Sequence, residues 1–196
     1  MSQEVEIEVK SMLTERAYHL LLKGFGLQET DAVVQHNHYF ETPNFSLKGK
    51  QSGLRIREIA RTFTLTLKQP FKVGKLETHQ QLSYQEWQLA QAKGKLPDGQ
   101  VMNQLIQLEI PVDQLKFQGT LTTSRIEFEY EGGILCFDKS SYFDQVDYEI
   151  EYEGKSEEHA NSTLSMILSN YQLSPLATEN KVRRFFNLKN QKQSEK

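Results

Sequence analysis

The sequence predicts a single α+β domain, built as a closed antiparallel β-barrel of about eight strands with helices packed outside. The first observation behind this prediction is that short segments alternate apolar and charged residues with period two, as half-buried strands do. The second is that the charged positions are mostly acidic in some strands and mostly basic in others. A barrel interior that holds both a cation and an anion would explain this segregation.

The opening segment, residues 4–10, is predicted to be one strand. Its apolar face carries Val5, Ile7 and Val9, while the other face is charged. That charged face carries Glu4, Glu6, Glu8 and Lys10. Like charges about 7 Å apart along one face repel one another. The fold therefore needs counter-charges, a metal ion or bulk water beside this strand.

The first half of the chain continues with a helix over residues 14–23, because Thr14 can cap its start and Gly24 can end it. Residues 41–50 contain Pro and Gly and are predicted to form a loop or a short helical turn. Trp87 and its apolar neighbours change the period to that of a helix over residues 83–93, followed by a short helix over residues 100–108. Strands are predicted at residues 36–40, 53–59, 61–68 and 76–82.

Period two returns in the second half. Gly132-Gly133 predicts a hairpin turn, and apolar residues at helical spacing predict a helix over residues 155–171. We expect one domain over residues 1–190 and a disordered polar tail over residues 191–196. Strands are predicted at residues 114–122, 123–130, 134–140, 147–153 and 181–188.

Composition restricts the function. The 196 residues carry a net charge of −3, which gives no case for sequence-specific nucleic-acid or membrane binding. No apolar run is long enough to span a bilayer, and no signal peptide is evident. A single cysteine, Cys136, excludes an internal disulfide framework, so we expect a cytoplasmic protein. Oligomeric state is left open.

The polar strand positions contain enough cations to bind a phosphate-rich ligand. A solvated sheet face is the ordinary interpretation of one such strand, but solvated faces usually mix in Ser, Gln and Asn. Arginine and lysine suit phosphate oxygens, and a triphosphate with roughly four charges would need many of them. The candidate cations are Lys10, Arg55, Arg57, Lys68, Arg125, Lys181 and Arg183.

The acidic positions predict a divalent cation. Buried carboxylates repel one another unless they are paired, and Mg²⁺ is usually held by carboxylates, waters and substrate phosphates. Glu127 is either a further interior acid or a neighbour of Arg125. The candidate metal ligands are Glu6, Glu8, Asp138, Glu149 and Glu151.

Five sequence blocks in order resemble the CYTH domain family, also called triphosphate tunnel metalloenzymes, and in particular its bacterial YjbK-like members. They comprise the Glu6-x-Glu8-x-Lys10 motif and residues 39–43, 54–57 and 65–68, with the late charges Glu149, Glu151 and Lys181. The resemblance covers residues 4–186. Glu41 stands where the family has Asp, and either Arg183 or Arg184 falls near a basic family position. A regular strand at 181–188 would place Arg183, and not Arg184, beside Lys181.

The resemblance implies an eight-stranded β-tunnel and hydrolysis of triphosphates with Mg²⁺ or Mn²⁺. It places Lys10, Arg55, Arg57, Lys68, Arg125 and Lys181 at phosphate-binding positions, and it suggests Glu77 as a further acid. We expect catalysis to depend most directly on Lys10, Arg57 and Glu149, and the general base is not assigned. Inorganic tripolyphosphate is the first choice of substrate, with thiamine triphosphate and nucleoside triphosphates next. The alternatives are an adenylate cyclase of the same fold and a non-catalytic module that binds polyphosphate or a nucleotide.

Overall fold

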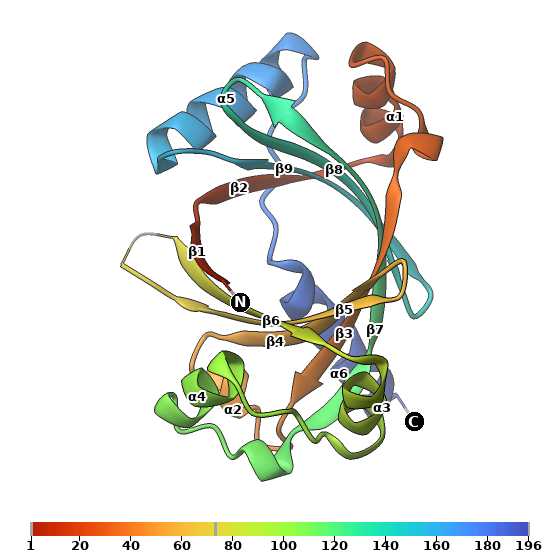
Figure 1. The fold of residues 1–196 in the computed structure, drawn as a ribbon. Helices are drawn as coiled ribbons and strands as arrows, with labels where there is room; N and C mark the ends of the chain where they lie inside the picture. Colours follow the sequence, from red (N-terminus) through yellow and green to blue (C-terminus); the bar gives the residue numbers. More distant parts are fainter. Residues whose placement is uncertain (1, 73, 196) are drawn as a thin grey trace. The chain divides into compact units, whose positions relative to one another are not determined.

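The computed structural model describes residues 2–72 and 74–195 (Figure 1). The chain forms two compact units, and each is described by itself. The first unit comprises residues 2–6 and 34–121, and the second comprises residues 7–33 and 122–195. Within the described residues, no helix has both the length and the apolar character needed to cross a membrane.

The first unit is an antiparallel sheet whose apolar face is covered by helices. Its core joins inward residues of the strands, such as Ile56 and Leu65, to Trp87 and Leu105 from two helices. Ser83 caps one helix by accepting from Glu86 N, and the Glu86 carboxylate accepts from Ser83 N at 2.7 Å. The strand order is β1 (Ser2–Glu6), β6 (Lys75–Leu82), β5 (Thr62–Pro70), β4 (Gly53–Ile59) and β3 (Val33–Glu41). The helical elements are α2 (Ser46–Gly49), α3 (Tyr84–Lys93), α4 (Gln100–Gln107) and the 3₁₀ turn η2 (Val112–Gln114).

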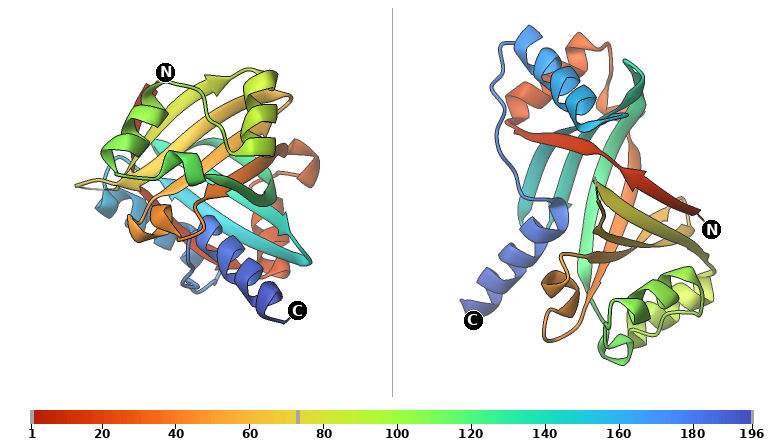
Figure 2. Two further views of the ribbon diagram at one scale, coloured as in Figure 1. Left: turned by 90° about the horizontal axis from the view of Figure 1, so that it is seen from below. Right: turned by 90° about the vertical axis from the view of Figure 1, so that its left-hand side faces the viewer.

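The second unit is also an antiparallel sheet with helices on its apolar face. Its core joins Phe137 and Ile150 of the strands to Leu21 of α1 (Glu15–Gly24) and Ile167 of α5 (Glu157–Asn170). Thr14 caps α1 as predicted, accepting a hydrogen bond from Ala17 N at 3.1 Å. The strand order is β7 (Lys116–Tyr130), β8 (Gly133–Tyr142), β9 (Gln145–Glu153) and β2 (Glu8–Leu13). The remaining elements are the 3₁₀ turn η1 (Glu29–Asp31) and α6 (Lys181–Ser194), which begins on the side of these strands away from α1 and α5 (Figure 2).

The opening segment is two strands rather than the predicted one. β1 pairs with β6, whereas β2 pairs with β9, and the ladder is interrupted at Ile7. The carbonyl of Ile7 accepts instead from Gly154 N at 2.9 Å. Conversely, residues 116–130 form the single strand β7 where two strands were predicted. The hairpin turn lies one residue earlier than expected, because the left-handed positions are Glu131 and Gly132.

The predicted strand over residues 181–188 is wrong, because these residues lie in helix α6. Asn180 caps this helix by accepting a hydrogen bond from Arg183 N at 2.9 Å. Val182 is the one β-branched residue of α6, and most of the others tolerate a helix well. The alternation of Lys181, Val182 and Arg183 is therefore too short to identify a strand, and it conceals a capped helix start.

Candidate active site

Charged residues of the second unit lie in two cross-strand rows because its four strands are in register. Arg125 on β7 stands opposite Asp138 on β8, which stands opposite Glu149 on β9. In the next row, Glu151 on β9 stands opposite Lys10 on β2. Side chains two residues apart on one strand share a face, so both rows project from the polar side of this sheet.

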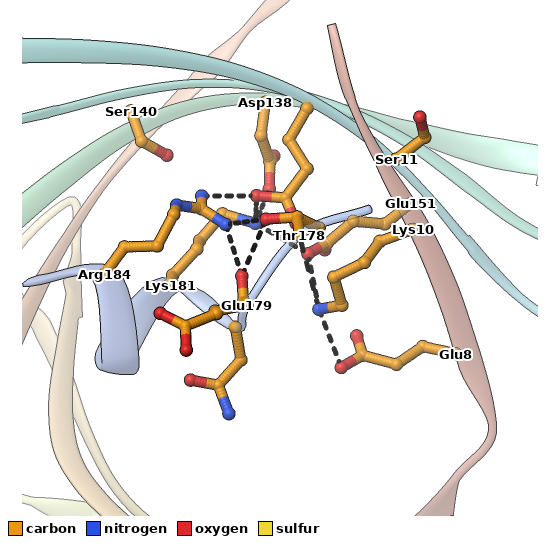
Figure 3. Close-up of polar contacts among 12 residues, drawn as sticks. Glu8, Lys10, Ser11, Asp138, Ser140, Glu151, Thr178, Glu179, Lys181 and Arg184 are labelled. Atoms are coloured by element: carbon orange, nitrogen blue, oxygen red, sulfur yellow. Dashed lines mark hydrogen bonds and ion pairs between the residues drawn. The ribbon is translucent and has the colours of Figure 1, made fainter. Parts of the chain in front are cut away.

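Lys181 lies at the centre of three carboxylates (Figure 3). Its Nζ is 2.7 Å from Asp138 Oδ2, 3.0 Å from Glu149 Oε2 and 2.6 Å from Glu151 Oε1. The side chains of the three acids are at most 8% exposed. Burial alone would lower the pKa of Lys181, but the three carboxylates outweigh it and raise that pKa above its usual value. The ammonium group is thus fixed in its charged form.

Arg125 binds the same acids from β7. Its guanidinium group donates from Nε to Asp138 Oδ1 at 2.8 Å and from an Nη to Asp138 Oδ2 at 2.6 Å. The same Nη donates to Glu151 at 2.5 Å. Burial disfavours ionisation of both acids, but the neighbouring cations outweigh it. Arg125 and Lys181 lower the pKa of Asp138 below its usual range. Lys181, Lys10 and Arg125 lower the pKa of Glu151 in the same way. Both carboxylates are therefore anionic at neutral pH.

Lys10 joins β2 to this cluster. Its Nζ is 2.9 Å from Glu8 Oε1 and 3.1 Å from Glu151 Oε1, and it lies 4.0 Å from Glu149 Oε1. That Glu149 oxygen is buried and accepts no hydrogen bond from the described residues. An unsatisfied carboxylate oxygen is costly unless a ligand completes its coordination. The site consequently has an acceptor available to a cation.

Arg184, rather than Arg183, completes the site from α6. It donates to Glu149 Oε2 at 2.7 Å and to Asp147 Oδ2 at 2.9 Å. Arg183 is 59% exposed and pairs with Glu179 at 3.3 Å, so its predicted place in the phosphate site is not supported. Residues three apart share a helix face, whereas residues two apart share a strand face. In helix α6, Arg184 therefore lies on the face of Lys181, where a strand would have placed Arg183. The Asn180 cap is the sequence signal that could have identified Arg184.

Two further residues of the second unit lie at the edge of this cluster. Glu127 is 54% exposed and 3.6 Å from Arg125, so the structure supports its interpretation as a neighbour of that arginine. Cys136 is buried, and burial raises the pKa of its thiol well above the usual value. A thiol held protonated in this way is not a nucleophile.

The other predicted residues lie in the first unit, where cations and acids also pair. Lys68 contacts Glu6 and lies 3.2 Å from Glu77, whose carboxylate is also 3.6 Å from Arg55. Burial opposes ionisation of Glu77, but Arg55 and Lys68 outweigh it and lower its pKa. Arg57 donates from Nε to the buried Asn37 Oδ1 at 3.1 Å.

Glu41, at the position where the resembled family has Asp, has a structural role. Its carboxylate accepts from the backbone N–H groups of Thr42, Leu47 and Lys48 at 2.8–3.0 Å. It is 3% exposed, and it thereby satisfies backbone donors around the start of α2.

Comparison with known proteins identifies one family. The CYTH domain matches residues 4–186. YjbK of Bacillus subtilis (strain 168), named as a candidate triphosphatase, is 40% identical over 187 residues, which are 95% of this chain and 96% of YjbK. The chain therefore belongs to the CYTH family.

Two solved structures extend the comparison. A protein of Bacillus halodurans, named as a candidate adenylate cyclase, is 50% identical with a TM-score of 0.91, covering 95% of this chain and all of the other. HpAC1 of Hippeastrum, named as a candidate adenylyl cyclase and described as having a dominant triphosphatase activity, is 24% identical with a TM-score of 0.78, covering 93% and 95% of the two chains. These likenesses confirm the predicted fold class. The described residues contain nine strands where the resemblance implies eight.

Proposed function

We propose that this protein is a divalent-metal-dependent hydrolase that cleaves the terminal phosphoanhydride bond of a triphosphate, with inorganic tripolyphosphate as its first substrate. The observation that carries the proposal is the convergence of Asp138, Glu149 and Glu151 around the single ammonium group of Lys181. Three carboxylates gathered in this way can also supply oxygen ligands to a hard divalent cation beside the ammonium group, and the cations around them suit phosphate.

The acids fit a metal ion. Asp138, Glu149 and Glu151, with Glu8 beside them, would hold Mg²⁺ or Mn²⁺, and Glu149 Oε1 is a buried acceptor with no hydrogen-bond donor among the described residues. When bound, the ion would neutralise carboxylate charge and polarise phosphate oxygens. Glu6 remains a ligand predicted from sequence.

The cations bind and orient the substrate. Lys10, Arg125, Lys181 and Arg184 are each paired with carboxylates, so their ammonium and guanidinium groups are held in fixed positions. We assign phosphate binding to these four residues and, in the first unit, to Arg55, Arg57 and Lys68. Lys10 would stabilise the charge that develops as water attacks the terminal phosphorus and the bridging P–O bond breaks. Arg57 remains a catalytic residue predicted from sequence.

The name of YjbK supports a triphosphatase, and the name of the Bacillus halodurans protein makes cyclisation of ATP the second candidate. Purified protein should therefore be incubated with tripolyphosphate, thiamine triphosphate and ATP in parallel, each with Mg²⁺ or Mn²⁺. Phosphate release and cyclic AMP are measured in the same samples. Metal-dependent phosphate release supports the hydrolase, cyclic AMP as the main product supports the cyclase, and tight binding without turnover supports a binding module.

Glu151→Gln tests the site itself. We expect this change to abolish metal-dependent phosphate release, because it removes an anionic charge shared by Lys10, Arg125 and Lys181. Glu129→Gln is the matched control, since Glu129 is an exposed acid on β7. Equal turnover in both variants would exclude Glu151 from the active site.

We also propose that the protein acts in the cytoplasm, where its buried Cys136 would stay reduced.

A further inference from the structure

A histidine and two glutamates of the first unit converge at the pairing of β1 and β6. Glu77 and His79 are two residues apart on β6 and share a face, and Glu4 on β1 stands directly opposite Glu77. One ligand atom from each residue lies within 4.8 Å of the other two. We propose that Glu4, Glu77 and His79 form a binding site for a transition-metal ion such as Zn²⁺, separate from the acids of the second unit.

The distances between ligand atoms suit such an ion. His79 Nε2 lies 2.9 Å from Glu4 Oε1 and 3.6 Å from Glu77 Oε2. Zinc binds nitrogen and oxygen at about 2.0–2.2 Å, so two ligands in a tetrahedral site are roughly 3.3–3.6 Å apart. Small side-chain movements would therefore admit the metal between His79 and Glu4.

The surroundings of His79 direct its Nε2 toward the site. Its other ring nitrogen, Nδ1, is 2.9 Å from Thr66 Oγ1, and Thr66 on β5 stands opposite His79 in the ladder. A hydroxyl that accepts from Nδ1–H leaves the lone pair on Nε2 for a metal. An acceptor for the other ring N–H orients the histidine ligands of metal sites. Thr66 is therefore assigned as a positioning residue.

The two carboxylates differ in a way that suits a metal site with water ligands. The Glu77 side chain is 2% exposed; its Oε1 atom pairs with the Lys68 ammonium group at 3.2 Å, and its Oε2 atom is the one that lies near His79. The Glu4 side chain is 58% exposed, so solvent can reach the remaining coordination positions. Lys68 and Arg55 reduce the negative charge around Glu77, which limits the affinity. Imidazole favours Zn²⁺ over Mg²⁺, whose ligands are oxygen atoms.

Titration of the full chain with Zn²⁺ by calorimetry tests the site. We expect His79→Gln to weaken one binding event by at least about 100-fold and Thr66→Val to weaken it by about 10-fold, as loss of an outer-shell partner does. His19→Gln is the matched control, because His19 is an exposed histidine that also has two glutamates, Glu15 and Glu29, within 4.0 Å. It should not change the affinity.

Two further measurements keep the proposal testable if His79→Gln does not fold. Glu4→Gln alters an exposed side chain and should weaken Zn²⁺ binding while leaving the fold intact. In the wild-type protein, Zn²⁺ should shift the nitrogen NMR signal of His79 Nε2 and leave Nδ1 protonated. Zn²⁺ affinity unchanged by His79→Gln and Glu4→Gln, or lost only in Glu151→Gln, would overturn the proposal. Phosphate release in Mg²⁺ is measured separately, so failure of this site does not affect the proposed hydrolase.

Discussion

Replacing Lys181 with methionine should destabilise the folded protein strongly. The change keeps an unbranched side chain of similar length but removes the ammonium group that three buried carboxylates share at 2.6–3.0 Å. Arg125, Lys10 and Arg184 still contact these acids. The repulsion among Asp138, Glu149 and Glu151 would nevertheless lose its central counter-charge.

The magnitude follows from burial. The Lys181 side chain is 14% exposed, and the three acids are 0%, 1% and 8% exposed, so little solvent can replace the lost charge. Removing one partner of a buried ion pair costs about 3–5 kcal/mol. We expect the lower end, about 3 kcal/mol, because three other cations remain. In a chain of this length that loss lowers Tm by roughly 10 °C.

Thermal and urea unfolding measure this change, with Arg183→Met as the control in the same first turn of α6. Arg183 is 59% exposed and pairs with Glu179, and an exposed pair of this kind contributes about 0–1 kcal/mol. Added Mg²⁺ should raise the Tm of Lys181→Met more than that of the wild type, because a cation that binds the folded state stabilises it. A loss below about 1 kcal/mol in Lys181→Met, or equal losses in both variants, would refute the reasoning.

Three other predictions concern stability and substrate binding. Burial disfavours ionisation of Asp138 and Glu151, but the neighbouring cations lower both pKa values below the value of roughly 4 in the unfolded chain. As pH falls, the unfolded state therefore binds more protons than the folded state. Their stabilisation should be complete above about pH 5 and lost as pH falls below about 4, which urea unfolding across pH would show. Glu41→Ala should cost about 1–2 kcal/mol in thermal unfolding, because it leaves backbone donors around α2 without their acceptor. Arg57→Ala should raise the KM for tripolyphosphate, and Asn37→Ala should raise it less, because Asn37 only orients the guanidinium group; an unchanged KM in Arg57→Ala would remove that residue from the site.

Alternation was enough to predict which side chains of a strand share a face. Arg125, Asp138, Glu149 and Glu151 were selected from period two alone, and the structure brings all four into one cluster. Period two fixes the facing of a strand but not its partner, so the sequence could not show that the opening segment divides at Ile7 between β6 and β9. Register depends on tertiary packing that no single segment contains.

Residues outside the alternation were harder to predict. His79 lies on a predicted strand, but its role depends on Thr66 and Glu4, which come from two other strands. The sequence showed only that Glu41 keeps the charge of the family's Asp. In the structure its carboxylate accepts hydrogen bonds from backbone N–H groups around α2, a helix of four residues. A helix this short has no detectable period in the sequence, so the function of its cap could not be anticipated.

Helix α6, which was predicted as a strand, shows why the need for cations was easier to predict than the positions of their side chains. An acidic row on β9 requires positive charge nearby, and that requirement holds whether a strand or a helix supplies it. Lys181 satisfies this requirement in both cases, because it is the first residue of the predicted strand and of the observed helix. The next cation depends on the element, because a helix directs Arg184 to Glu149 while Arg183 turns to solvent. Charge balance therefore identifies the residue type that a site needs, and local backbone preference, here the Asn180 cap, decides which residue supplies it.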